Sequence, residues 1–66
     1  MNKGFVVKTT ILSKKEEFSI QDIKTEVGKD ISNDYIEKVL EELVSLGLVY
    51  DRGNKFLTKQ KRLVYI

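Results

Sequence analysis

The stretch from Ser32 to Val49 (SNDYIEKVLEELVSLGLV) constrains the fold of this chain more than any other. Its apolar residues recur every three or four positions, which places them on one face of a helix: Ile36, Val39, Leu40, Leu43, Val44 and Leu46. The hydroxyl of Ser32 can cap the start, and Gly47 can take the left-handed conformation that ends a helix. The β-type residues Leu48-Val49-Tyr50 follow at once. We therefore predict a helix over 33–46 that leads directly into a strand.

Composition excludes several kinds of chemistry. The 66 residues suffice for one domain, which we expect to span residues 1–66. The chain has no cysteine and no histidine, which excludes disulfides, thiolate zinc sites and the usual general base. Acid pairs such as Glu16-Glu17 are expected on solvated helical surface, with no nucleophile beside them. We therefore predict no enzyme activity and no cofactor.

The chain also lacks the signals that direct a protein into or across a membrane. No apolar run approaches the roughly 18 residues of a membrane span. Lys8 and two threonines interrupt the apolar start (MNKGFVVKTTILSKK), which therefore does not form a signal-peptide core. We expect a soluble, cytoplasmic protein with no membrane partner.

Charge is unevenly distributed along the chain. Residues 1–15 carry four bases and no acid, residues 16–51 carry three bases and all ten acids, and residues 52–66 carry five bases and no acid. These segments hold +4, −7 and +5, which together give the net charge of +2. Two basic ends therefore flank an acidic middle.

A first helix is predicted over 4–15, although its sequence is ambiguous. Its apolar residues would gather on one side of a helix, but the β-branched run from Val6 to Ile11 would also suit a strand. We predict a helix because helices follow.

A second helix is predicted over 20–27. Ser19 can cap its start, and Asp22 follows three residues later, as in a capping box. Gly28 is placed to stop it. The linker to the helix over 33–46 is then short, and we expect its apolar residue, Ile31, to point inward.

A hairpin is predicted over 48–58. Two short strand candidates, 48–51 and 55–58, are separated by Arg52-Gly53-Asn54, where glycine and asparagine can supply positive φ. Residues 59–66 form a basic and then apolar end. This end could add a third strand to the sheet, pair with the same segment of a second subunit, or serve as an interaction tail.

The order of these elements resembles a winged-helix DNA-binding domain. Three sequence patterns carry the resemblance, which covers roughly residues 5–58: Ser19-Ile20-Gln21-Asp22-Ile23, Leu40-x-x-Leu43-x-x-x-Gly47-Leu48-Val49, and Phe56-Leu57-Thr58. It implies an α+β, mostly helical domain, with a three-helix helix-turn-helix core followed by a two- or three-stranded β-wing. In this family the third helix reads base edges and the wing contacts the DNA backbone or minor groove.

The resemblance implies two sets of DNA-binding residues. The first lies at the start of the third helix: Ser32, Asn33, Asp34, Tyr35 and Lys38. The second lies in the wing and the tail: Arg52, Asn54, Lys55, Lys59, Lys61 and Arg62. Lys8, Lys14 and Lys15 of the first basic segment are possible additions.

Each of these residues also has a plainer explanation. Ser32 can serve only as a cap, Tyr35 can pack on the helix surface, and the bases can serve solubility. The acids of the third helix oppose DNA, because phosphate contacts dominate affinity: Asp34, Glu37, Glu41 and Glu42 face a single base, Lys38. Either only one edge of this helix contacts DNA, or the helix is not the main element that reads the bases.

Two functions are compatible with these observations. The first is double-stranded DNA binding by a small transcription regulator, which as a homodimer would place two reading heads on one site. The alternative is a protein–protein interaction module of a replication, transcription or cell-division complex. Its partner would bind at the third helix or at the wing edge.

Overall fold

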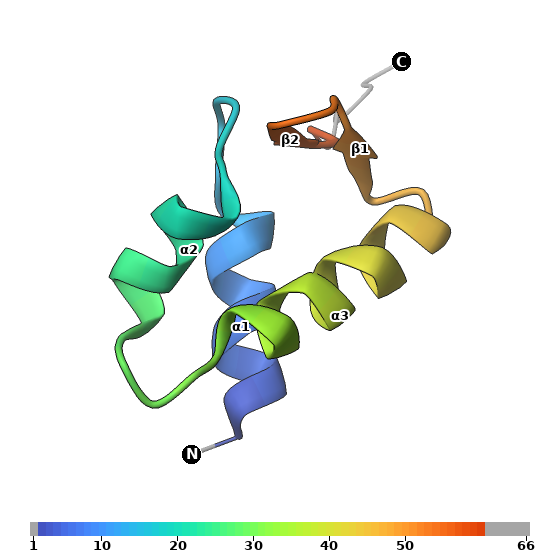
Figure 1. Cartoon of the computed structure of the whole chain (residues 1–66). Helices are drawn as coiled ribbons and strands as arrows, with labels where there is room; N and C mark the ends of the chain where they lie inside the picture. The colour runs from blue at the N-terminus through green and yellow to red at the C-terminus, as the bar shows by residue number, and fades with distance from the viewer. Residues whose placement is uncertain (1, 61–66) are drawn as a thin grey trace.

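Three helices followed by an antiparallel hairpin form the computed structural model, which describes residues 2–60 (Figure 1). The elements are α1 (Lys3–Leu12), α2 (Ile20–Val27), α3 (Asn33–Ser45), β1 (Val49–Asp51) and β2 (Phe56–Thr58). This confirms the predicted α+β fold with a helix-turn-helix core and a β-wing. The expectations for residues 61–66, including Lys61 and Arg62, lie outside the described residues.

The first segment is a helix, but it ends at Leu12 rather than near residue 15. Val7 and Ile11 are fully buried one helical turn apart. A further turn would bring Lys15 to the next position on that face, where a charge cannot be buried without a partner. The predicted end was therefore wrong, and the chain leaves the helix through Ser13, whose N–H donates to the Thr9 carbonyl at 3.1 Å.

Both ends of α2 agree with the sequence. The Ser19 hydroxyl accepts from the Asp22 N–H at 3.2 Å, and the Asp22 carboxylate accepts from the Ser19 N–H at 2.9 Å. This is the reciprocal pair of a capping box. At the other end Gly28 has φ of 95°, a conformation that favours glycine.

The end of α3 turns the chain into the wing. Gly47 has φ of 76°, its N–H donates to the Val44 carbonyl at 3.0 Å, and the Leu48 N–H donates to the Leu43 carbonyl at 2.9 Å. This pair of bonds is a Schellman motif, in which the left-handed residue satisfies carbonyls that the helix leaves free. Leu46 is the cap residue, so α3 ends one residue before the predicted boundary.

The hairpin pairs Val49 with Thr58 at its base and Asp51 with Phe56 next to the turn. Gly53 has φ of 91°, and its N–H donates to the Asp51 carboxylate at 2.9 Å. Asn54 does not share the positive φ that the sequence predicted for it. One glycine, together with the Asp51 side chain, is sufficient to reverse the chain.

A third strand position, at Phe18, was not predicted. Phe18 forms an antiparallel bridge with Phe56 through two backbone bonds of 2.9 and 2.8 Å. The two rings stack with centroids 6.0 Å apart. The segment between α1 and α2 therefore holds the outer edge of β2 against the helices.

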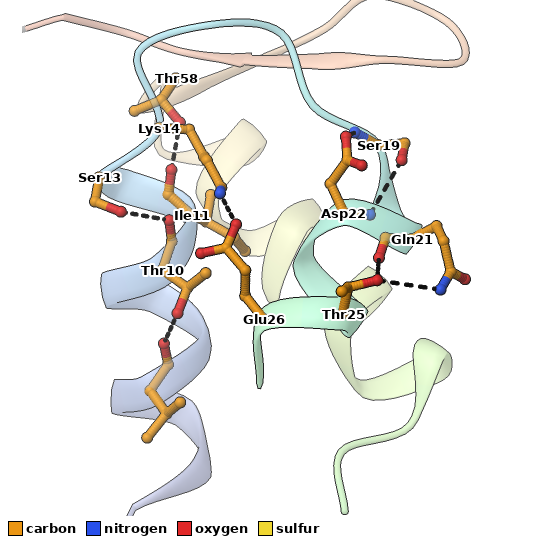
Figure 2. A network of polar contacts seen from close by, with 11 residues as sticks. Thr10, Ile11, Ser13, Lys14, Ser19, Gln21, Asp22, Thr25, Glu26 and Thr58 are labelled. Atoms are coloured by element: carbon orange, nitrogen blue, oxygen red, sulfur yellow. Dashed lines mark hydrogen bonds and ion pairs between the residues drawn. The ribbon is translucent and has the colours of Figure 1, made fainter. Parts of the chain in front are cut away.

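The core lies between the three helices and the hairpin. Its buried apolar residues come from the three helices, from β1 and from the segments that connect the helices: Val7, Ile11, Phe18, Ile23, Ile31, Ile36, Val39, Leu40, Leu43 and Val49. Ile31 points inward, as predicted. Thr58 is also buried, and its hydroxyl donates to the Ile11 carbonyl at 2.6 Å, which ties the wing to the end of α1 (Figure 2). Over residues 2–60, no helix has the length and apolar character needed to cross a membrane.

Candidate functional site

The structure divides the charged residues of α3 among different sides of the helix. Glu42 faces α1, where its carboxylate lies 3.1 Å from the Lys8 ammonium. Both side chains remain about half exposed, so this pair adds at most about 1 kcal/mol to stability. Glu42 and Lys8 therefore belong to the contact between two helices.

Two of the candidate residues on α3 contribute to the fold. The Ser32 hydroxyl accepts from the Tyr35 N–H at 3.1 Å and so caps the helix. Tyr35 is partly buried against the core. Its hydroxyl lies next to Gly4 at the start of α1, only 3.2 Å from where a Cβ at that position would lie. Tyr35 therefore packs between α1 and α3.

The other three candidates on α3 are exposed: Asn33, Asp34 and Lys38. None of them forms an ion pair or a side-chain hydrogen bond within residues 2–60. Asn33 and Asp34 lie in the first turn, where free backbone N–H groups and the helix dipole favour a negative ligand. This part of α3 therefore combines hydrogen-bonding side chains, one carboxylate and one base.

A groove of about 380 Å³ lies between α3 and the hairpin. Three carboxylates line it, from Glu37, Glu41 and Asp51, and no lysine or arginine of residues 2–60 does. The remaining lining residues are Ile20, Leu40, Val44, Ser45 and Phe56, so its surface is apolar between the acids. Among residues 2–60, no group of three or more acidic side chains is arranged to hold a metal ion. The groove is therefore an acidic and apolar surface suited to a basic ligand.

Sequence reasoning missed this groove, because residues of four elements, α2, α3, β1 and β2, build it. Ile20 begins α2, Glu37 and Glu41 lie one turn apart on α3, and Asp51 ends β1. The spacing of Glu37 and Glu41 is the one local signal, since it puts both carboxylates on the same edge of the helix. Nothing local indicates that Asp51 joins them.

The candidate DNA-binding residues of the wing and of the segment that follows it lie at the surface. Arg52, Asn54, Lys55 and Lys59 are all exposed. Arg52 is already engaged, because its Nε lies 3.7 Å from the Glu17 carboxylate of the segment before α2. This distance and exposure make the pair weak enough for a ligand phosphate to displace. Lys55 and Lys59 form no ion pair within the described part of the chain.

The possible additions from the first basic segment are partly neutralised. Lys14 forms an ion pair with Glu26 of α2 (Figure 2). The Lys14 carbonyl accepts from the Gln60 side chain at 3.1 Å. Lys8 pairs with Glu42, as described above. Lys15 is exposed and forms no ion pair within residues 2–60. The first segment therefore offers less free positive charge than its sequence suggests.

The surroundings of the Asp22 carboxylate, which caps the start of α2, lower its pKa. The hydrogen bond from the Ser19 N–H lowers the pKa of Asp22 below its usual value. The Ser19 hydroxyl and the nearby charges of Lys55 and Lys14 lower this pKa further. Asp22 therefore stays ionised at neutral pH and offsets part of the positive charge of Lys55.

Comparisons with protein families, curated proteins and solved structures found no match to this chain. The winged-helix resemblance therefore depends on the sequence patterns and on the order of the elements.

Proposed function

We propose that this chain is a winged-helix protein that binds double-stranded DNA through one edge of α3, the wing and the basic C-terminal residues. The observation that supports it is the separation of charges on α3. Glu42 faces α1, and Glu37 and Glu41 line the groove. Asn33 and Lys38, in contrast, are exposed and form no ion pair within residues 2–60, and Asp34 is the one acid of α3 that remains with them. This favours contact by one edge of the helix.

Phosphate contacts would come mainly from the bases. Lys38, Lys55 and Lys59 are exposed. Arg52 would give up only its weak ion pair with Glu17 when it binds a phosphate. Lys61 and Arg62 follow in the sequence. About five such contacts predict a log–log salt dependence with a slope near −4. Asn33 is the candidate for base reading, because its amide can pair with the edge of adenine.

The proposal is tested by removing the wing charges. Replacing Arg52 and Lys55 together by alanine should weaken binding on every sequence and flatten the salt slope by about two. Fluorescence anisotropy of a labelled random-sequence duplex measures both quantities.

A matched control removes two bases elsewhere: Lys3→Ala with Lys29→Ala. Lys3 begins α1 and Lys29 lies in the turn before α3, and both are exposed. This double variant has the same net charge as the wing variant, so overall charge is held constant. Equal losses in the two variants would refute a contact specific to the wing.

A second function, protein–protein interaction, is supported by the acidic groove. A surface that carries Glu37, Glu41 and Asp51 repels phosphate but attracts a basic segment of another chain. A chain without DNA affinity at low salt, which bound a basic and apolar peptide instead, would favour this function over the first.

A further inference from the structure

The groove between α3 and the hairpin has the chemistry of a peptide-binding surface. Glu37 and Glu41 lie along one side and Asp51 lies on the hairpin, while Ile20, Val44 and Phe56 supply apolar surface. These three apolar side chains are only partly buried. A ligand that covered them would remove apolar area from water, and its bases would compensate the carboxylates. The groove therefore selects a segment with positive charge next to apolar residues.

The end of this chain has that composition. Residues 61–66 read Lys61-Arg62-Leu63-Val64-Tyr65-Ile66, which is two bases followed by four apolar residues. We propose that the groove binds residues 61–66 of a second copy of the chain. Lys61 and Arg62 would meet the carboxylates, and the apolar residues would cover the floor. This goes beyond DNA binding, since it assigns a partner to a surface that repels phosphate. In such a dimer the groove holds Lys61 and Arg62, so the phosphate contacts come from Lys38, Arg52, Lys55 and Lys59.

The direction of the chain favours exchange between two copies. Asp51 and Phe56, which line the groove, form the cross-strand pair next to the hairpin turn. The chain leaves the sheet from Thr58, at the opposite end of the hairpin, and the Gln60 side chain is bonded to the Lys14 carbonyl. From Thr58 to Gln60 the chain therefore leads away from the end of the groove that Asp51 and Phe56 line, which favours the groove of a second copy over its own.

Exchange of this kind makes two identical contacts related by a two-fold axis. It also offers a direct test, because each contact joins a carboxylate of one copy to a base of the other. Glu41→Lys puts a positive charge into the groove beside Glu37 and Asp51, and Arg62→Glu puts a negative charge into the segment. Each change alone should weaken self-association at least about tenfold, because like charges then face each other. In an equimolar mixture, a heterodimer would have opposite charges at both contacts.

The experiment is sedimentation velocity on the full chain, without DNA, at low ionic strength. We expect the unaltered chain to dimerise with rising concentration, each variant to remain mostly monomeric, and the mixture to recover the dimer. Circular dichroism checks that each variant is folded, which is expected because Glu41 is exposed and Arg62 follows β2 in the sequence. The charge-matched controls are Asp30→Lys and Lys29→Glu in the exposed turn between α2 and α3. Both controls should dimerise like the unaltered chain.

Three results would overturn the proposal. The first is an unaltered chain that stays monomeric at concentrations of hundreds of micromolar. The second is a dimer that neither substitution weakens, which would place the interface elsewhere. The third is a mixture that does not recover the dimer, since the groove and the segment would then not contact each other.

Discussion

Thr58→Val removes the one buried hydroxyl of residues 2–60 while keeping the shape of the side chain. The Thr58 hydroxyl donates to the Ile11 carbonyl at 2.6 Å, and Thr58 is only 3% exposed. The carbonyl would still accept from the Lys14 N–H at 3.2 Å, so it would not become an unpaired buried group. The expected loss is therefore that of one neutral hydrogen bond, about 1 kcal/mol in the free energy of unfolding.

Urea unfolding followed by circular dichroism measures this loss. With a slope of about 1 kcal/mol per molar urea for a small domain, the midpoint should fall by about 1 M with the slope unchanged. Thr25→Val is the matched control, because the Thr25 hydroxyl bonds the Gln21 carbonyl at 2.9 Å on an exposed side of α2. Water can replace that bond, so the midpoint should stay nearly constant. A Thr58→Val midpoint equal to that of the unaltered chain would show that this hydrogen bond does not stabilise the fold.

Two further predictions concern the core and the α2 cap. Leu40→Ala should cost about 2–5 kcal/mol, because Leu40 is 1% exposed, whereas Leu46→Ala should change stability little, because Leu46 is 65% exposed. Equal urea midpoints for the two variants would contradict the position of α3. Asp22 has a lowered pKa in the folded chain, so its ionised form stabilises the fold above the unfolded pKa of about 3.9. That stabilisation is lost as the pH falls through the lower folded pKa. The stability difference between the unaltered chain and Asp22→Asn should therefore shrink below about pH 4. A difference that stayed constant from pH 7 to pH 3 would disprove the role given to this carboxylate.

Local sequence signals account for α2 and α3 almost completely. The capping box of Ser19 and Asp22 and the glycines Gly28 and Gly47 act within a few residues of the ends that they set. Their effect therefore does not depend on distant parts of the chain. The apolar pattern of α3 was also correct, because Ile36, Val39, Leu40 and Leu43 are all buried.

The features that were missed depend on contacts between distant residues. Phe18 pairs with Phe56, which is 38 positions away in the sequence. Thr58 bonds to Ile11, which is 47 positions away. The ambiguity of α1 has a related cause, since Phe5 and Leu12 remain exposed and weaken its helical pattern. Helix α1 ends just after Ile11, its last buried residue, and no local sequence signal marks that position.

The candidate site was predictable only in part. The exposure of Asn33, Lys38 and Lys55 follows from their positions on predicted elements. The ion pairs could not be predicted from position, because Arg52 pairs with Glu17 and Lys14 pairs with Glu26 across the fold. The groove needed the hairpin to fold back against α3 before Asp51 could join Glu37 and Glu41.

The most direct test of the central claim is the affinity of the full chain for a random-sequence DNA duplex at two salt concentrations. Fluorescence anisotropy should show binding in the micromolar range at low salt, which weakens with a log–log slope near −4 as the salt is raised. A chain that leaves the duplex unbound even at low salt would contradict DNA binding. It would leave the acidic groove as the functional surface of this fold.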